Sequence, residues 1–90
     1  MRVAWDPDKA RANRIKHGIR FSDAGGVLVD PLAITTEDTT SSGERRFVTV
    51  GTDQCGRVIV VVHAMGDMGP RIISARRATR KERNQYEEGV

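Results

Sequence analysis

The chain has 90 residues, 38% of them hydrophobic and 4% aromatic, which allows one domain with a modest core and excludes disorder throughout. Its one cysteine, Cys55, excludes an internal disulfide, and no apolar run approaches the roughly 20 residues that span a bilayer. We therefore expect a cytoplasmic protein with no membrane contact, whose net charge of +3 is a weak indication of a polyanionic partner.

The distribution of charge is more informative than its sum, because two basic segments flank an acidic one. Residues 9–20 contain only basic charges: Lys9, Arg11, Arg14, Lys16 and Arg20. Residues 21–44 contain only acidic charges, and residues 71–83 are again basic except for Glu82. If the two basic segments meet on one face of the fold, they form a surface suited to nucleic acid.

The N-terminal third of the chain predicts a short strand followed by two helices. Asp6 is placed to cap a helix that has Pro7 at its first position, and Gly18 is placed to end it. Ser22 is the candidate cap of the second, shorter helix. The expected elements are a strand over 2–5, a helix over 7–17 and a helix over 23–29.

The rest of the chain predicts four strands and a final helix. The expected strands are 32–36, 45–51, 57–64 and 71–77, with a polar loop over 37–43 and turns over 53–56 and 66–70. Thr79 and Glu82 form a capping box, so the final helix begins there. Short turns predict an antiparallel meander with helices on one side, and therefore one α+β domain over residues 1–90.

The sequence lacks the signatures of several enzyme classes. His17, His63 and Cys55 do not have the spacing of metal ligands, so we expect no metal and no cofactor. The chain has no glycine-rich phosphate loop after a strand and no nucleophile elbow. His63 ends an apolar strand, which is typical of a half-buried histidine with a hydrogen-bond partner.

The side chains that remain for chemistry are mainly arginines. Arg71, Arg76 and Arg77 lie on one predicted strand, and Arg46 on a neighbouring strand is expected across from them. Guanidinium groups match the oxygens of a phosphate two at a time. Strand alternation places Arg76 on the opposite face from Arg71 and Arg77 unless a bulge intervenes.

Each candidate also has a purely structural interpretation. An arginine-rich edge strand is commonly a solvated edge that resists aggregation. Glu44 is a candidate partner for a nearby arginine, and Tyr86 a candidate anchor for the last helix. Lys16 and His17 complement the dipole of the first helix, and Trp5 is expected in the core.

An ordered set of residues along nearly the whole chain resembles the BrnT family. The N-terminal part of this set is Trp5-Asp6-Pro7, Lys9-Ala10, Asn13, Lys16-His17-Gly18, Phe21 and Ala24. Its C-terminal part is Asp30-Pro31, Glu44, Arg46, Gly51, the valine-rich strand ending in His63, Arg71-Ile72-Ile73-Ser74-Ala75-Arg76, Glu82 and Tyr86. The order and spacing of the set are more specific than any one motif in it.

The resemblance implies a toxin of a type II toxin–antitoxin system with a fold similar to RelE-type ribonucleases. It implies an endoribonuclease that inhibits translation and is neutralised, in a hetero-oligomer, by a ribbon-helix-helix antitoxin of the BrnA type. It further implies that the complex binds operator DNA through the antitoxin. Two alternatives remain open, a nucleic-acid-binding module without catalysis and a module that binds an acidic partner.

The implied reaction is metal-independent cleavage, in which the ribose 2′-hydroxyl attacks the adjacent phosphate. It requires a base, an acid and cations around the phosphorane oxygens. The candidates for catalysis are Lys16 or His17 for proton transfer, Glu44 as a rival base, and Arg46 and Arg76 for transition-state charge. The candidates for RNA binding are Lys9, Arg71, Arg77 and Arg80.

Overall fold

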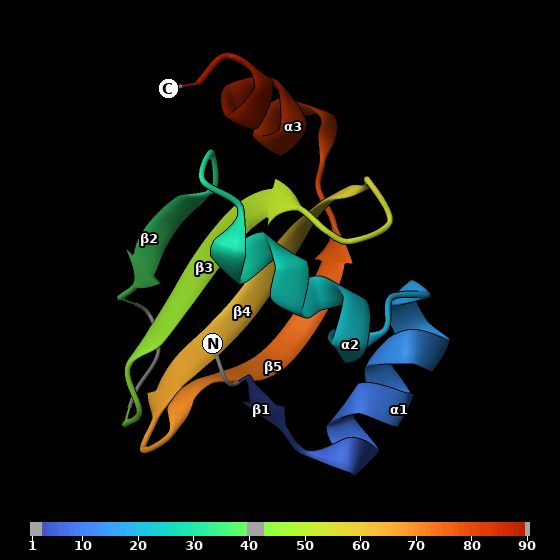
Figure 1. Ribbon diagram of the computed structural model, residues 1–90, viewed down its shortest axis with the longest axis vertical. Helices are drawn as coiled ribbons and strands as arrows, with labels where there is room; N and C mark the ends of the chain where they lie inside the picture. Colours follow the sequence, from blue (N-terminus) through green and yellow to red (C-terminus); the bar gives the residue numbers. More distant parts are fainter. Residues whose placement is uncertain (1–2, 40–42, 90) are drawn as a thin grey trace.

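A five-stranded sheet in the order β1-β5-β4-β3-β2 forms the centre of the fold (Figure 1). The computed structural model describes residues 3–39 and 43–89. The strands are β1 (Ala4–Trp5), β2 (Ile34–Asp38), β3 (Arg46–Thr52), β4 (Val58–Gly66) and β5 (Gly69–Arg77). Strands β2 to β5 form the expected antiparallel meander, whereas β1 runs parallel to β5. The predicted α+β architecture is therefore confirmed.

The helices are α1 (Pro7–His17), α2 (Phe21–Ala24), the 3₁₀ helix η1 (Gly25–Val29) and α3 (Arg80–Glu87). Asp6 caps α1 and Gly18 ends it with φ of 72°, as expected. The prediction that Ser22 caps the second helix was wrong, because the helix begins one residue before Ser22, at the buried Phe21. After α2, the helix continues with 3₁₀ geometry from Gly25 and Gly26 onward. No helix among the described residues is long and apolar enough to cross a membrane.

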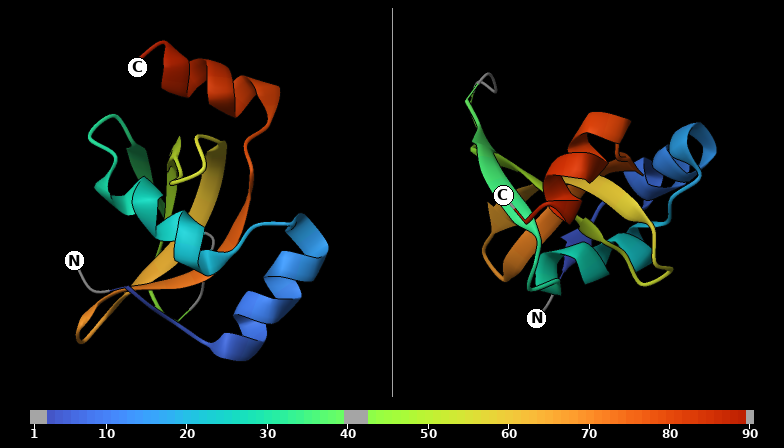
Figure 2. Two further views of the ribbon diagram at one scale, coloured as in Figure 1. Left: turned by 45° about the vertical axis from the view of Figure 1, so that its right-hand side comes forward. Right: turned by 90° about the horizontal axis from the view of Figure 1, so that it is seen from above.

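One face of the sheet is covered by α1, α2 and η1 (Figure 2). The core between them consists of Ile19, Phe21, Ala24, Val27, Ile59, Val61, Ile72 and Ala75. Trp5, expected in the core, lies instead at its rim, 37% exposed and edge-on to Phe21. In both figures α3 lies apart from these helices, beyond one end of the sheet.

A β-bulge in β5 changes which side chains share a face. Val62 pairs with Ser74, but the next residue of β4 pairs with Ile72, which leaves Ile73 as the extra residue. Arg71 and Arg76 therefore lie on the same face, opposite the helices. Strand alternation separated these two arginines unless a bulge intervened, and this bulge is that exception. Of the three arginines of β5, only Arg77 is on the helix side of the sheet.

Asn13 of α1 replaces a neighbouring strand along part of β5. Because β1 pairs only with Arg71 and Ile72, the edge of β5 lacks a strand partner at Ala75. The buried Asn13 amide accepts from the Ala75 N–H at 3.1 Å and donates to the Ala75 carbonyl at 2.8 Å. It also donates to the carbonyl of Ile19 at 3.1 Å, which fixes the turn after α1. One side chain thus joins helix, turn and sheet.

We predict that Asn13→Ala lowers the free energy of unfolding by about 3 kcal/mol or more, because it leaves three buried backbone groups without partners. Urea denaturation followed by circular dichroism measures the change. Asn84→Ala, the same substitution at an exposed position of α3, is the control and should change stability by less than about 0.5 kcal/mol. Equal effects at the two positions would contradict this role of Asn13.

Candidate active site

The sheet face opposite α1 and α2 presents three arginines, and we call it the arginine face. Arg46 of β3 and Arg71 of β5 both pair with Ala64 of β4, so they flank one fully buried alanine. Arg76 pairs with Val60, four residues further along β4. At about 3.3 Å per residue, this separation is roughly 13 Å. The expectation that Arg46 lies across from the arginines of β5 therefore holds for Arg71 only, and β4 lies between the two strands.

Glu44 lies on the arginine face because of how β3 begins. Arg45 binds the Glu37 carboxylate through two nitrogens, each at 3.0 Å, and so points to the opposite face. Alternation then places Glu44 on the same side as Arg46. A terminal nitrogen of Arg71 donates to both oxygens of Glu44, at 2.5 and 2.6 Å.

We call Glu44 and the three basic residues whose charges act on it the Glu44 cluster: Lys9, Glu44, Arg46 and Arg71. The pairing of β1 with Arg71 holds the start of α1 nearby. The hydrogen bond from Arg71 holds the pKa of Glu44 below its usual 4.5, and the charges of Arg71, Arg46 and Lys9 lower it further. Three cations therefore favour the ionised form of this carboxylate, which stays ionised at neutral pH.

Arg46 carries a donor that the described part of the chain does not satisfy. Its Nε is buried and has no acceptor among residues 3–39 and 43–89. A buried donor without a partner is costly and uncommon outside functional sites. A phosphate oxygen entering the Glu44 cluster is an acceptor of the right kind for this group.

Arg76 is held at the other end of the arginine face by α3. Two of its nitrogens donate to the two oxygens of Glu82, at 2.8 and 3.0 Å. Glu82 also accepts from the Thr79 N–H at 2.8 Å in the predicted capping box, which is confirmed. The bond from Arg76 lowers the pKa of Glu82 to about 2, and the Thr79 N–H contributes to the shift. Both terminal nitrogens of the Arg76 guanidinium group are thus already hydrogen-bonded to Glu82.

Tyr86 is the second attachment of α3, as its interpretation as a helix anchor predicted. Its hydroxyl donates to Asp30 at 2.6 Å and lies 2.8 Å from the hydroxyl of Thr52. The Asp30 carboxylate that accepts this bond raises the pKa of the phenol, so Tyr86 remains protonated. Asp30 also accepts from the Thr52 N–H at 2.9 Å. The tyrosine therefore joins α3 to the end of η1 and to β3.

Other candidates lie away from the Glu44 cluster. Lys16 and His17 end α1, which packs on the opposite face of the sheet, so the structure does not bring them to this cluster. Arg77 is exposed on the helix side, and Arg80 is exposed at the first position of α3. The RNA-binding candidates are therefore spread over more than one face.

His63 lies on the helix side of the sheet and is not part of the arginine face. Its Nε2 is 2.8 Å from the Thr49 hydroxyl, and its ring stacks on Phe47 with centroids 5.9 Å apart. Its Nδ1 is buried without a partner among the described residues. Burial lowers the pKa of His63, so the ring is neutral at pH 7. The expected hydrogen-bond partner is confirmed for one ring nitrogen only.

Two contacts at this site were not predicted from the sequence. The pairing of Arg76 with Glu82 follows from the capping box, because that motif turns the Glu82 carboxylate back toward the end of β5. The nearness of Lys9 to Glu44 depends on the parallel pairing of β1, which no local pattern indicates. Within residues 3–39 and 43–89, no three histidine, cysteine, aspartate or glutamate side chains are grouped as a metal site requires.

Comparisons with known proteins identify the family. Residues 5–82 match the family model described as the ribonuclease toxin BrnT of type II toxin–antitoxin systems. This chain belongs to the BrnT family. The crystal structure of the BrnT ribonuclease toxin of Brucella abortus matches with a TM-score of 0.64 and 25% identity, over 89% of this chain and 99% of that one. No curated protein sequence matches.

Membership confirms the predicted resemblance and defines the activity as that of a ribonuclease toxin with an antitoxin partner and an RNA substrate. The agreement with the Brucella abortus BrnT structure also confirms the arrangement of helices around a mostly antiparallel sheet. The match to the family model ends at Glu82, the residue that binds Arg76. The arginine face therefore lies within the matched part of the BrnT domain.

The lowered pKa of Glu82 predicts an acid-dependent loss of stability. Above pH 4.5 the carboxylate is ionised in both the folded and the unfolded chain, and the ion pair contributes fully. As the pH falls from 4.5 toward 2, the unfolded chain takes up the proton first, so this contribution is lost. Urea denaturation at pH 6 and pH 3 should show a smaller pH effect in Glu82→Gln than in wild type. Glu88→Gln is the matched control and should keep the wild-type pH effect.

Proposed function

We propose that the Glu44 cluster is the catalytic centre of this BrnT toxin and cleaves RNA without a metal ion. The observation that supports this most is the placement of Arg46 and Arg71 on either side of Ala64, with Glu44 beside them. Two guanidinium groups on one face can hold the two non-bridging oxygens of a single phosphate. A carboxylate next to that phosphate is in position to accept a proton from the ribose.

In the proposed step the 2′-hydroxyl attacks the adjacent phosphorus and gives its proton to Glu44. The bond from phosphorus to the 5′-oxygen breaks, which leaves a 2′,3′-cyclic phosphate and a 5′-hydroxyl end. Lys9 donates the proton to the leaving oxygen, because the arginines of the cluster do not deprotonate. Arg46 and Arg71 stabilise the additional negative charge of the phosphorane.

Substrate binding would prepare Glu44 for this role. In the free protein the hydrogen bond from Arg71 makes Glu44 a weak base. When a phosphate accepts hydrogen bonds from the Arg71 guanidinium group, Glu44 loses its bond from Arg71 and the pKa of Glu44 rises toward 4.5. Lys16 and His17, which were rival candidates for proton transfer, are less suited because they lie on the other side of the sheet. Arg76 would bind a neighbouring phosphate of the same RNA strand.

The partner proposed for this toxin is a ribbon-helix-helix antitoxin of the BrnA type, and family membership supports it. The basic arginine face offers such a partner a complementary target for acidic side chains. We further propose that the complex, through the antitoxin, binds operator DNA in the cytoplasm. A short reading frame for a ribbon-helix-helix protein next to the toxin gene would be consistent with this pairing.

We predict that Arg46→Ala and Arg71→Ala each reduce the rate of RNA cleavage by about 10²- to 10³-fold, because each removes a donor to the phosphorane. The measurement is single-turnover cleavage of a labelled RNA by the purified toxin. It should yield 2′,3′-cyclic phosphate ends and proceed unchanged in EDTA. Arg83→Ala, on the exposed side of α3, is the matched control and should cleave at the wild-type rate.

Three results would contradict this assignment. Wild-type rates in both variants would move the catalytic centre away from the Glu44 cluster. Loss of cleavage in EDTA would contradict the metal-independent step. Unchanged RNA ends together with growth arrest in cells would favour the alternative of a module that binds RNA and does not cut it.

The antitoxin proposal predicts that the antitoxin, and not the toxin, makes the specific contacts with DNA. In electrophoretic mobility shifts with the promoter of its own gene, the toxin alone should produce no specific shift, whereas toxin and antitoxin together should. The antitoxin should also abolish cleavage at a one-to-one ratio. A specific shift by the toxin alone would contradict the assignment of the DNA contacts to the antitoxin.

A further inference from the structure

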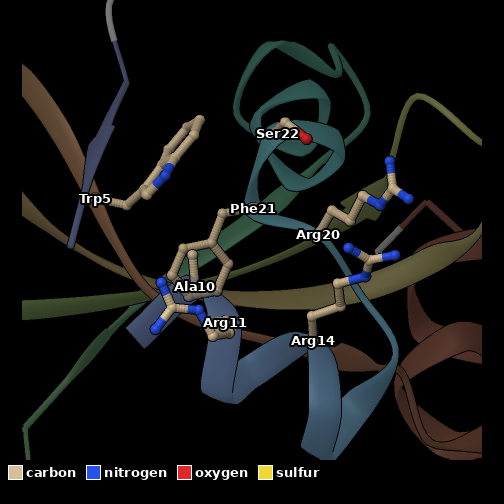
Figure 3. A pocket seen from close by; sticks show the side chains of 7 residues that line it. All are labelled: Trp5, Ala10, Arg11, Arg14, Arg20, Phe21 and Ser22. Atoms are coloured by element: carbon tan, nitrogen blue, oxygen red, sulfur yellow. The ribbon is translucent and has the colours of Figure 1, made fainter. Parts of the chain in front are cut away.

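A pocket of about 290 Å³ lies on the helix side of the molecule, between α1 and α2, away from the arginine face (Figure 3). Its lining residues are Trp5, Ala10, Arg11, Arg14, Arg20, Phe21 and Ser22. The proposed catalytic step uses none of them. A volume of this size is at the lower end of sites that bind small molecules.

Two of its arginines lack an acidic partner. Arg14 and Arg20 make no hydrogen bond or ion pair with their side chains among residues 3–39 and 43–89. In Figure 3 their guanidinium groups lie close together at one side of the pocket. Like charges held together in this way are relieved by an anion. Arg11, by contrast, pairs with Asp8 at 3.3 Å.

The fold holds this pair in place. Gly18 ends α1 in the left-handed conformation and its N–H bonds to the Arg14 carbonyl at 2.8 Å, so the chain turns back directly after Arg14. Asn13 then fixes the next residue through the Ile19 carbonyl. Arg20 therefore returns to the same side of α1 as Arg14.

The opposite side of the pocket is aromatic. Trp5 is 37% exposed and contacts the buried Phe21 edge-on, with ring centroids 6.3 Å apart at 79°. Because the indole lines the pocket and is not fully covered by Phe21, a planar group can stack on its exposed part (Figure 3). The pocket thus combines a surface for stacking with a pair of cations.

We propose that this pocket binds one nucleotide of an RNA strand, with its base on Trp5 and its phosphate on Arg14 and Arg20. A base stacked on an aromatic side chain strengthens binding independently of the RNA sequence. The site rests on the proposed function to the extent that its natural ligand is the RNA that the toxin cleaves. It would hold that strand at a second point, remote from the Glu44 cluster.

An acidic protein segment is a less suitable occupant. The guanidinium forks suit the two oxygens of a carboxylate as well as the two non-bridging oxygens of a phosphodiester, so the distinction between these occupants depends on the rest of the pocket. The volume is too small for a helix, and a stacking surface offers little to an aspartate or glutamate side chain. The mixture of aromatic and cationic walls is typical of sites for single-stranded nucleic acid.

The fluorescence of Trp5 tests the proposal directly, because it is the only tryptophan of the chain. Titration of the whole protein with adenosine 5′-monophosphate should quench this fluorescence in a saturable way. Arg14→Ala and Arg20→Ala should each raise the dissociation constant at least tenfold. Arg83→Ala, remote from the pocket on α3, should leave it unchanged.

Inorganic phosphate and a polyglutamate peptide are the comparison ligands. Binding of inorganic phosphate as tightly as the nucleotide would overturn the stacking contribution and leave an anion site only. Quenching by the peptide and not by the nucleotide would overturn the proposal in favour of a protein partner, and no quenching at millimolar nucleotide would also overturn it. None of these readings depends on cleavage, so a failure of the catalytic assignment is seen separately in the cleavage assay.

Discussion

The extra residue in β5, Ile73, determines what both faces of the sheet present. Without it, Arg71 and Arg76 would lie on opposite faces, and Ile72 and Ala75 could not both enter the core. The bulge therefore has two effects. It lets Ile72 and Ala75 both enter the core beneath the helices, and it places Arg71 and Arg76 together on the other face. Next to it, Asn13 supplies the hydrogen bonds that an edge strand would have made, so the bulged strand keeps its place beside α1. Bulges commonly redirect side chains beside functional sites.

The arginine face is neutralised in part by carboxylates that come from outside the sheet. Glu44 precedes β3, and Glu82 belongs to α3. Such pairs keep the guanidinium groups oriented, and in the proposed function an incoming phosphate must compete with them. In the proposed function, an RNA strand has the advantage in this competition because it presents several phosphates to the arginine face, whereas an acidic side chain presents one carboxylate. The arrangement thus links selectivity to the same contacts that stabilise the free toxin.

Much of this could be predicted from the sequence, and what could not has physical causes. Capping residues such as Asp6 and Thr79 located the helices, and valine-rich β4 marked the central strand. The bulge could be named only as a possible exception to strand alternation, because no residue near Ile73 indicates a bulge. The exposure of Trp5 and its place in a pocket arise from tertiary packing against Phe21, which no local periodicity reports. Family resemblance supplied the activity, whereas the grouping of Lys9 with Glu44 required the long-range pairing of β1.

The capping carboxylate of α3 has a consequence for the dynamics of the toxin. None of the residues of α3 is buried, so this eight-residue helix gains little from the core and is too short to be stable alone. Its first turn depends on Glu82, and Glu82 also holds Arg76. Melting of the helix and release of the arginine are therefore one cooperative event rather than two. Amide hydrogen exchange along α3 would report, in the same measurement, how often Arg76 is available to bind an anion.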